Sequence, residues 1–203
     1  MSAQALKHFR MVDPILAAAA KKVWPVELRW RAAADFFAAL CNEIVSQQLS
    51  DKVADVLYGR LNQICAGRIT AKKIIRLTDQ QLRDTGMSWS KVKFIKNLAN
   101  AVTTKAINLN QLTTLEDKLV VAELTKLPGI GPWTAEMFLM FSLGREDIFS
   151  YGDLGLRKGL QKVYNFKKEP TFKQMKKIVE AWKPYRTHGA RYMWASLENL
   201  LIP

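Results

Sequence analysis

Apolar residues recur along most of this chain at the three- and four-residue spacing that is typical of helices. Residues 33–47 predict a helix with one buried stripe, formed by Phe36, Phe37, Leu40, Cys41, Ile44 and Val45. A second amphipathic helix is predicted after Ser50, with an apolar face formed by Val53, Val56, Leu57, Leu61 and Ile64. The same period predicts helices over residues 90–102 and about 114–126, the latter carrying Leu119, Val120 and Leu124.

Capping residues place the starts of further helices. Asp13 before Pro14 predicts a helix that runs to about residue 23, because both residue types favour the first helical turn. Thr78 and Gln81 have the spacing of a capping box and predict a short helix, ended by the turn at residues 86–88. Additional helices are predicted over residues 132–142, 154–163, 171–181 and about 187–200. With no strand pattern, repeat or long linker, the chain is expected to be a compact all-α protein.

Composition adds a clue about the partner. Apolar residues make up 49% and charged residues 24% of the 203 positions, which is the balance of a globular protein and excludes wholesale disorder. The 31 lysines and arginines exceed the 18 acidic residues, so the net charge is +13, of which residues 151–203 carry +7. This excess favours a polyanionic partner, either nucleic acid or an anionic membrane surface.

Other sequence features narrow the class of protein. No run approaches the roughly 18 apolar residues of a membrane span, and residues 1–10 lack the order of a signal peptide, so we expect a cytoplasmic or nuclear protein. Cys41 and Cys65 lie in apolar helical patterns, which predicts reduced core thiols, and two cysteines are too few for a four-cysteine iron–sulfur cluster. His8 and His188 stand alone and are interpreted as surface or packing residues.

The helical pattern breaks most sharply at residues 127–135, Leu-Pro-Gly-Ile-Gly-Pro-Trp-Thr-Ala. Gly129 and Gly131 permit positive φ and close backbone approach, and the helix that starts at Pro132 offers unpaired N–H groups that suit a phosphate. Taken alone, the glycines are better explained by an ordinary helix C-cap followed by a proline at the next helix start.

The complete string resembles the helix-hairpin-helix of the DNA glycosylase superfamily, in particular the 3-methyladenine DNA glycosylase II type that removes alkylated bases. The resemblance implies that the hairpin grips double-stranded DNA and that its carbonyls hold Na⁺ or K⁺ without side-chain ligands. The hairpin residues concerned are Leu127, Pro128, Gly129, Ile130, Gly131 and Thr134. The resemblance also places the catalytic carboxylate at Asp153, 24 positions after Gly129, whereas Asp147 comes too early.

Three further segments support the resemblance, which spans about residues 13–194. Residues 44–50 are similar to the loop that inserts into the duplex, with Gln48 as the plug and Leu49 its neighbour, and residues 86–91 resemble the segment before the next helix. Residues 182–187, followed by Trp194, resemble the C-terminal signature of the alkylation-specific branch. The implied base pocket comprises Trp133, Trp194, Met137 and Tyr185. Met137 stands where an aromatic residue is expected, which leaves the substrate range open.

The chemistry gives these residues specific roles. An ionised Asp153 at a helix N-terminus would oppose the positive charge of an oxocarbenium-like state, although the same position also suits a simple N-cap. Trp133 and Trp194 would hold a flipped, cationic base through cation–π attraction, although each also suits core packing. Trp133 replaces the lysine with which some relatives cleave the strand, so a monofunctional enzyme is expected, with slow lyase activity of Lys126 or Lys158 left open.

The resemblance implies two helical subdomains flanking a DNA cleft, residues 32–143 and residues 1–31 with 144–203. We therefore expect a monomeric base excision repair enzyme that acts on 3-methyladenine and 7-methylguanine in the cytoplasm or nucleoid, or in the nucleus of a eukaryote. One alternative is the same chemistry on uracil, hypoxanthine or an oxidised purine, and another is a protein that binds lesions without catalysis. A membrane-surface protein is disfavoured because the basic residues accompany a DNA-type hairpin rather than an amphipathic helix with a continuous apolar face.

Overall fold

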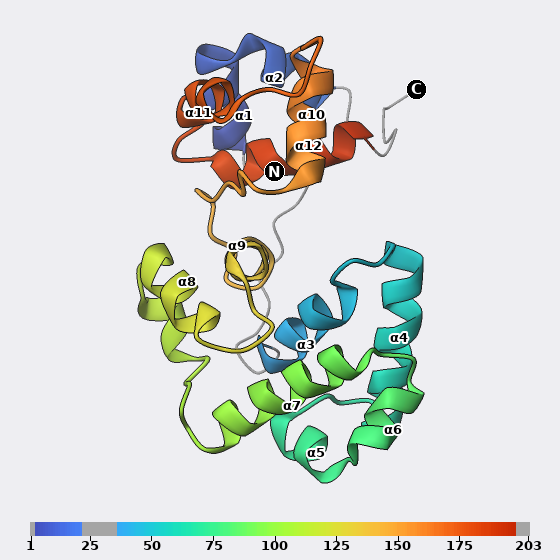
Figure 1. The fold of residues 1–203 in the computed structure, drawn as a ribbon. Coiled ribbons are helices and arrows are strands. Elements are labelled where there is room, and N and C mark those ends of the chain that lie inside the picture. Colours follow the sequence, from blue (N-terminus) through green and yellow to red (C-terminus); the bar gives the residue numbers. More distant parts are fainter. Residues whose placement is uncertain (1–2, 22–35, 198–203) are drawn as a thin grey trace. The chain divides into compact units, whose positions relative to one another are not determined.

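The computed structural model describes residues 3–21 and 36–197, and within these ranges every regular element is a helix (Figure 1). The prediction of an all-α protein is therefore confirmed for the described residues. The α-helices are α1 (Ala3–Val12), α2 (Pro14–Lys21), α3 (Phe36–Ser46), α4 (Asp51–Ile64), α5 (Ala71–Arg76), α6 (Asp79–Asp84), α7 (Trp89–Thr103), α8 (Asp117–Thr125), α9 (Pro132–Phe141), α10 (Leu154–Val163), α11 (Phe172–Glu180) and α12 (Arg186–Leu197). A short 3-10 helix lies at Gln111–Thr114.

The chain divides into two compact units, each of which is described by itself. Unit 1 combines residues 1–29 with residues 144–203, and unit 2 is the continuous stretch 30–143. In unit 2, α3 packs against α4, α7 and α9, while α8 packs against α9. All six residues of the stripe predicted on α3 are buried, so this helix forms the centre of the unit.

Two predicted apolar faces are partly wrong. On α4, Leu57 and Leu61 are buried with Ala54, whereas the predicted face members Val53, Val56 and Ile64 are exposed. On α8, Val120 and Leu124 are buried but Leu119 is exposed. Valine and isoleucine therefore extend the apolar period beyond the stripe that faces the core.

Most predicted helix starts are confirmed. Thr78 and Gln81 form both reciprocal hydrogen bonds of a capping box, and Thr171 with Gln174 forms a second one. Ser50 is the N-cap residue of α4, although its side chain makes no capping hydrogen bond. The pattern did not predict α1 or α5. The predicted helical residues 22–23, 33–35 and 198–200 lie outside the described part of the chain.

Unit 1 has its own core, assembled from α1 and α2 together with α10, α11 and α12. Asp13 caps α2 as predicted, because its Oδ1 accepts a hydrogen bond of 2.9 Å from the Leu16 amide. Its other carboxylate oxygen accepts from Trp182 Nε1 at 2.8 Å and from the hydroxyl of Tyr164. Burial, followed by the hydrogen bond to Asp13, raises the pKa of Tyr164. This buried polar cluster ties α2 to α10 and to the segment before α12.

The cysteines and the described helices agree with the sequence interpretation on two points. Cys41 and Cys65 are free and buried, and burial raises the pKa of both thiols. Among the described helices, none combines the length and apolar character that crossing a membrane requires.

Candidate active site

The hairpin of unit 2 is a tight turn between α8 and α9. The amide of Ile130 donates a hydrogen bond of 3.1 Å to the carbonyl of Leu127, and Ile130 anchors the turn because its side chain is buried. Gly131 is the N-cap residue of α9 with extended backbone, and Pro132 occupies the first turn. The first N–H groups of α9 have no acceptor within the helix, as at every helix start.

The two hairpin glycines serve different purposes. Gly129 has φ +88°, and a Cβ placed on it would lie 2.1 Å from Cγ of Phe94 in α7. Gly131 has no positive φ, and no atom other than those of its chain neighbours lies within 4 Å of the position that its Cβ would take. Backbone conformation and packing therefore both require glycine at position 129, whereas the space beside Gly131 is open to a ligand.

The loop after α3 contacts the hairpin through Gln47. Its Nε2 donates to the carbonyl of Gly129 at 2.8 Å and to Oγ1 of Thr134 at 3.2 Å. The side chain of Thr134, which we assigned to the DNA-binding hairpin, is thus buried behind the hairpin and supports it from within. Sequence reasoning missed this role of Gln47, because no local pattern indicates a partner so distant along the chain.

The predicted plug, Gln48, is exposed at the tip of the same loop and has φ +58°. This left-handed conformation is uncommon for a residue with a side chain. Leu49 is half-buried beside it, and its amide donates to the carbonyl of Ser46 at 3.1 Å. The loop therefore presents Gln48, rather than Leu49, to the solvent.

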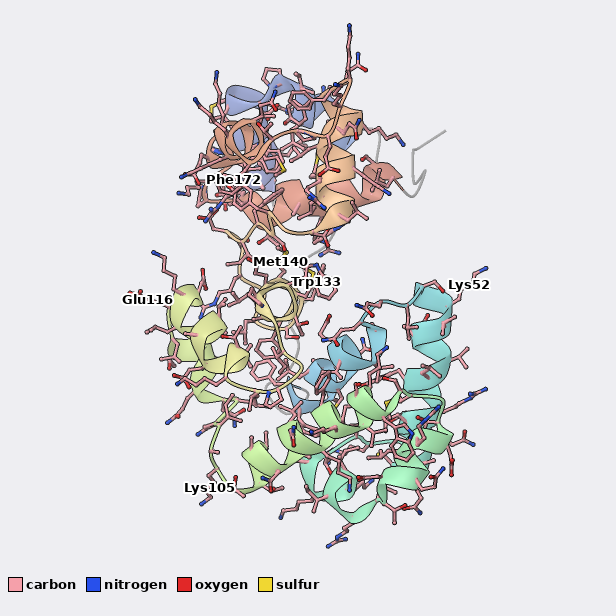
Figure 2. All side chains as sticks on the ribbon, in the orientation of Figure 1. Lys52, Lys105, Glu116, Trp133, Met140 and Phe172 are labelled. Atoms are coloured by element: carbon pink, nitrogen blue, oxygen red, sulfur yellow. The ribbon has the colours of Figure 1, made fainter. Side chains whose placement is uncertain are left out.

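Two of the predicted base-pocket residues lie on α9. Trp133 is 38% exposed in the first turn of the helix, where Figure 2 labels it, whereas Met137 is buried one turn later. Trp133 is thus partly exposed next to the hairpin.

In unit 1, Asp153 is the N-cap residue of α10. Its Oδ1 accepts a 2.7 Å hydrogen bond from the amide of Leu156 and a 2.9 Å hydrogen bond from Trp194 Nε1. The capping role that we considered for Asp153 is therefore present. The indole of Trp194, also predicted to take part in the site, lies directly against the predicted catalytic carboxylate.

Small residues on α10 allow this contact. A Cβ on Gly155 would lie 2.9 Å from both Cδ1 and Nε1 of Trp194, and a Cβ on Gly159 would lie 2.6 Å from the carbonyl oxygen of Met193. These two glycines are four residues apart and therefore share one face of α10. The close approach of α12 to this face brings Trp194 to the start of α10, a role of Gly155 and Gly159 that the sequence analysis did not identify.

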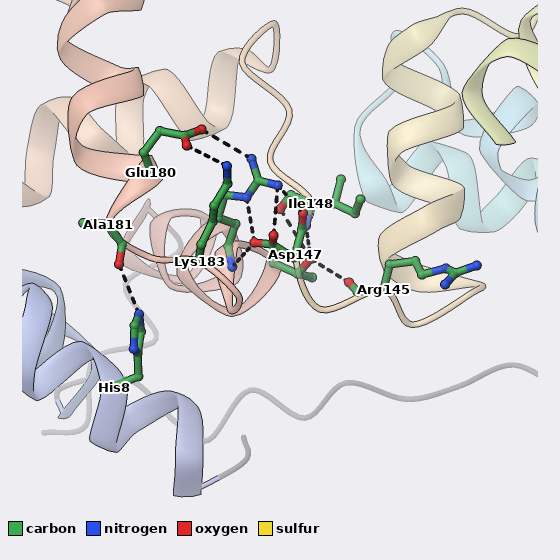
Figure 3. A network of polar contacts seen from close by, with 9 residues as sticks. His8, Arg145, Asp147, Ile148, Glu180, Ala181 and Lys183 are labelled. Carbon is green, nitrogen blue, oxygen red and sulfur yellow. Dashed lines mark hydrogen bonds and ion pairs between the residues drawn. The ribbon is translucent and has the colours of Figure 1, made fainter. Parts of the chain in front are cut away.

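An ion-pair network fixes the segment that leads to Asp153 (Figure 3). Arg186, at the start of α12, donates from Nε to Oδ1 of Asp147 at 2.7 Å and from Nη2 to Oδ2 at 3.1 Å. Its Nη1 also lies 3.7 Å from Glu180, which pairs in turn with Lys183 at 2.7 Å. Asp147 is thus held by a bidentate ion pair, which gives it a structural role distinct from that predicted for Asp153.

The neighbouring residue Thr187 holds the same segment through hydrogen bonds. Its Oγ1 donates to the carbonyl of Arg145 at 2.7 Å and accepts from the amide of Ile148 at 3.0 Å, while its own amide donates to the carbonyl of Glu146 at 2.9 Å. Residues 145–148 are therefore fixed to the start of α12, the same helix that carries Trp194.

The predicted pocket residue Tyr185 is half-buried between two histidines. Its ring centroid lies 5.4 Å from that of His8 and 5.9 Å from that of His188, both in edge-on geometry. His8 Nε2 lies 3.1 Å from the carbonyl oxygen of Ala181, which secures α1 to the segment after α11 (Figure 3). Both histidines therefore pack or bridge elements, as the sequence interpretation expected.

The two lysines considered for lyase activity lie on the protein surface. Lys126 is exposed and pairs with Glu123 at 2.6 Å, and Lys158 is exposed on α10. The described residues contain no group of three or more His, Cys, Asp and Glu side chains that could hold a metal ion.

The chain is similar to known proteins in sequence and in fold. The model of a family described as HhH-GPD superfamily base excision DNA repair protein matches residues 41–184. DNA-3-methyladenine glycosylase 1 of Schizosaccharomyces pombe is 32% identical over 161 residues, which cover 78% of this chain and 71% of that protein.

Solved structures match nearly the whole chain. The DNA-3-methyladenine glycosidase of Bacillus halodurans gives a TM-score of 0.85 at 33% identity, covering 98% of this chain and 91% of the other. A 3-methyladenine DNA glycosylase of S. pombe, solved in complex with abasic DNA, gives a TM-score of 0.86 at 28% identity and 95% coverage of both chains. From its hairpin, its fold and the family match, the chain belongs to the HhH-GPD superfamily of base excision DNA repair proteins.

Proposed function

We propose that this protein is a monofunctional DNA glycosylase of the 3-methyladenine glycosylase II type, which hydrolyses the N-glycosidic bond of alkylated purines such as 3-methyladenine and 7-methylguanine. The observation that carries the proposal is the carboxylate of Asp153, fixed at the start of α10 by the Leu156 amide and the Trp194 indole. The S. pombe and B. halodurans relatives, both named as 3-methyladenine enzymes, support the substrate class.

Binding of double-stranded DNA begins at the hairpin in this proposal. The open space beside Gly131 and the N–H groups of the first turn of α9 suit a backbone phosphate. The net charge of +13 supports binding through long-range attraction.

The hairpin carbonyls also fit a monovalent cation. The carbonyl of Leu127 accepts one hydrogen bond from Ile130 and that of Gly129 accepts one from Gln47, so each oxygen keeps a second lone pair for a cation. Na⁺ or K⁺ would supply positive charge next to a phosphate. Exchanging K⁺ for tetramethylammonium at constant ionic strength should weaken DNA binding, and an unchanged affinity would contradict a cation at the hairpin.

Displacement of the damaged base would depend on Gln48 and the aromatic residues. The exposed Gln48 would fill the space left in the base stack, which offsets part of the few kcal/mol that unstacking costs. Trp133, Trp194, Met137 and Tyr185 would receive the extruded base. Alkylation at a ring nitrogen makes the base cationic, so the indole faces attract it.

Asp153 would then stabilise the positive charge that develops on the sugar as the glycosidic bond breaks, and it would orient the water that attacks C1′. The bonding electrons leave with the base, which becomes neutral because it was cationic. The protein therefore needs no strong general acid for this leaving group.

Strand cleavage is not part of the proposed reaction. Trp133 occupies the position at which some members of the superfamily carry an attacking lysine, and Lys126 is paired with Glu123. Borohydride reduction during turnover should therefore trap no covalent complex with DNA. A trapped complex would show a lyase step and would overturn this part of the proposal.

The decisive experiment compares the native chain with Asp153→Asn on methylated duplex DNA, with the released bases resolved by chromatography. Asparagine is as good an N-cap residue as aspartate, so this variant should fold with native stability. We expect the native chain to release 3-methyladenine and 7-methylguanine as a monomer, and the variant to be at least about 100-fold slower with unchanged DNA affinity.

Three other outcomes of this experiment would change the proposal. Equal release by both chains would remove Asp153 from catalysis but keep the enzyme. Release only from DNA containing uracil, hypoxanthine or oxidised purines would overturn the substrate class. DNA binding without any base release would indicate a lesion-binding protein.

A further inference from the structure

A half-buried lysine holds the C-terminal end of α3. Lys91, in the first turn of α7, donates from Nζ to the carbonyl of Val45 at 2.7 Å and to the carbonyl of Gln47 at 2.8 Å. A cation at a helix C-terminus satisfies carbonyls that have no intrahelical partner and complements the helix dipole. Burial lowers the pKa of Lys91, so the two carbonyls replace part of the solvation that the ammonium group has lost. Lys91 thus fixes the backbone immediately before Gln48.

The side chain of the same Gln47 fixes the hairpin. Its Nε2 has two acceptors, the Gly129 carbonyl on the turn and the Thr134 hydroxyl in the first turn of α9. Gln47 therefore joins three elements. Its backbone carbonyl accepts a hydrogen bond from Lys91 of α7, and its side-chain amide donates to the turn and to α9. Without this amide, the buried Thr134 hydroxyl and the Gly129 carbonyl would lose their common donor.

Gln48 needs such support because of its backbone. Its φ of +58° places it in the left-handed region, which costs roughly 1 kcal/mol for a residue with a Cβ. The flanking backbone is held on both sides, before Gln48 by Lys91 at the Gln47 carbonyl and after it by the hydrogen bonds from the amides of Val53 and Ala54 to the Ser50 carbonyl. Strained backbone persists where the surroundings hold it in place.

We propose that Gln47 and Lys91 are positioning residues that hold the plug Gln48 and the DNA-binding hairpin in one fixed geometry, so that gripping the backbone and displacing the base occur together. This inference rests on the proposed function, since it assigns Gln48 to the duplex. We call the two side chains and their four acceptors the Gln47–Lys91 brace. Neither side chain needs to touch the reacting atoms.

The test uses two variants that remove donors with little change of shape, Gln47→Met and Lys91→Met. Lys91→Arg keeps the charge and the donors, and Lys93→Met removes an exposed lysine of the same helix as a matched control. Base displacement is followed by the fluorescence of 2-aminopurine placed beside 7-methylguanine, in a duplex whose 2′-fluorinated sugar slows hydrolysis. Single-turnover release is measured on the unmodified sugar.

We expect Gln47→Met and Lys91→Met to reduce base displacement and single-turnover release about tenfold, with Lys91→Arg largely restoring both and Lys93→Met close to native. Hydrogen exchange should become faster in residues 46–50 and 127–134, while the unfolding transition remains cooperative. Native displacement and native exchange in Gln47→Met would overturn the brace. If that variant does not fold, the Lys91→Met and Lys91→Arg pair decides.

A coupling measurement separates positioning from a general structural effect. If Gln47 acts through Gln48, then Gln47→Met should reduce base displacement much less in a chain that already carries Gln48→Ala. An equal loss in both backgrounds would overturn the positioning role. Failure of the native chain to release methylated bases would refute the proposed function, whereas hydrogen exchange in residues 46–50 and 127–134 would still decide on the brace.

Discussion

At the scale of single residues, Gly129 and Gly131 occupy adjacent parts of one turn and meet different surroundings. Gly129 combines positive φ with the ring of Phe94 at less than a van der Waals distance from any added Cβ, whereas Gly131 has neither constraint. Sequence alone assigned both glycines to the hairpin and could not separate their roles. The difference depends on Phe94, which belongs to another helix.

Alanine substitutions should separate these two roles. Gly129→Ala should lower the free energy of unfolding by about 3 kcal/mol, since it adds overpacking to an unfavourable φ. Gly131→Ala should change the free energy of unfolding by about 1 kcal/mol or less, as expected for an N-cap change, yet should weaken DNA binding. Urea unfolding and titration with duplex DNA measure the two effects. Native DNA affinity of Gly131→Ala would contradict a phosphate at this position.

Gln48 should show a conflict between stability and activity. Gln48→Gly relieves the left-handed strain and is expected to raise the free energy of unfolding by up to about 1 kcal/mol, while base displacement falls. Gln48→Ala should lose base displacement without the gain in stability, because alanine keeps its Cβ. Thermal unfolding and 2-aminopurine fluorescence provide the measurements, and a less stable glycine variant would refute the argument from strain.

At the scale of elements, local signals predicted starts and ends better than faces. Capping residues such as Asp13 and Thr78 act on their own helix, and their predicted roles are confirmed. The six residues of α5 are too few to show a helical period, and the exposure of Val53 depends on where neighbouring helices lie. The hydrogen bond of Asp153 to Trp194 depends on the crossing of α10 and α12, which no local pattern encodes.

The α10–α12 crossing should respond differently to alanine at its two glycines. Gly159→Ala meets the backbone of Met193, which cannot move alone, so we expect a loss of about 3 kcal/mol in the free energy of unfolding. Gly155→Ala meets the indole of Trp194, so the ring should shift away from Asp153 and base release should fall more than stability does. Single-turnover release and urea unfolding, measured on both variants, test this contrast. Similar effects on both quantities at both positions would contradict it.

At the scale of the whole molecule, the excess of basic residues predicted a polyanionic partner, and the helical period predicted the fold class. Membership of the superfamily agrees with both predictions. The pH dependence of folding could not be predicted, because it depends on which titratable groups are buried. His188, at the start of α12, is almost fully buried, and burial lowers its pKa below 6.5 although Glu146 lies 3.4 Å away and acts in the opposite direction.

This histidine should make folding sensitive to mild acid. Between the lowered pKa of the folded state and the value of 6.5, the unfolded chain binds more protons, so the His188 contribution is fully present above pH 6.5 and is lost as the pH falls below it. His188→Gln removes this titration and should flatten the change in unfolding free energy between pH 6.5 and 5. Urea unfolding at a series of pH values measures it, and parallel curves for both chains would refute the assignment.

The division of the chain also orders events during synthesis. Unit 2 is continuous, whereas the core of unit 1 joins Phe9 and Leu16 to Leu160 and Trp182 from the far end of the sequence. Domains fold as units while the chain emerges from its N-terminus. The apolar faces of α1 and α2 therefore lack their packing partners until α10 and α12 have left the ribosome. A growing chain would thus complete its hairpin first and gain the ordered carboxylate of Asp153 last.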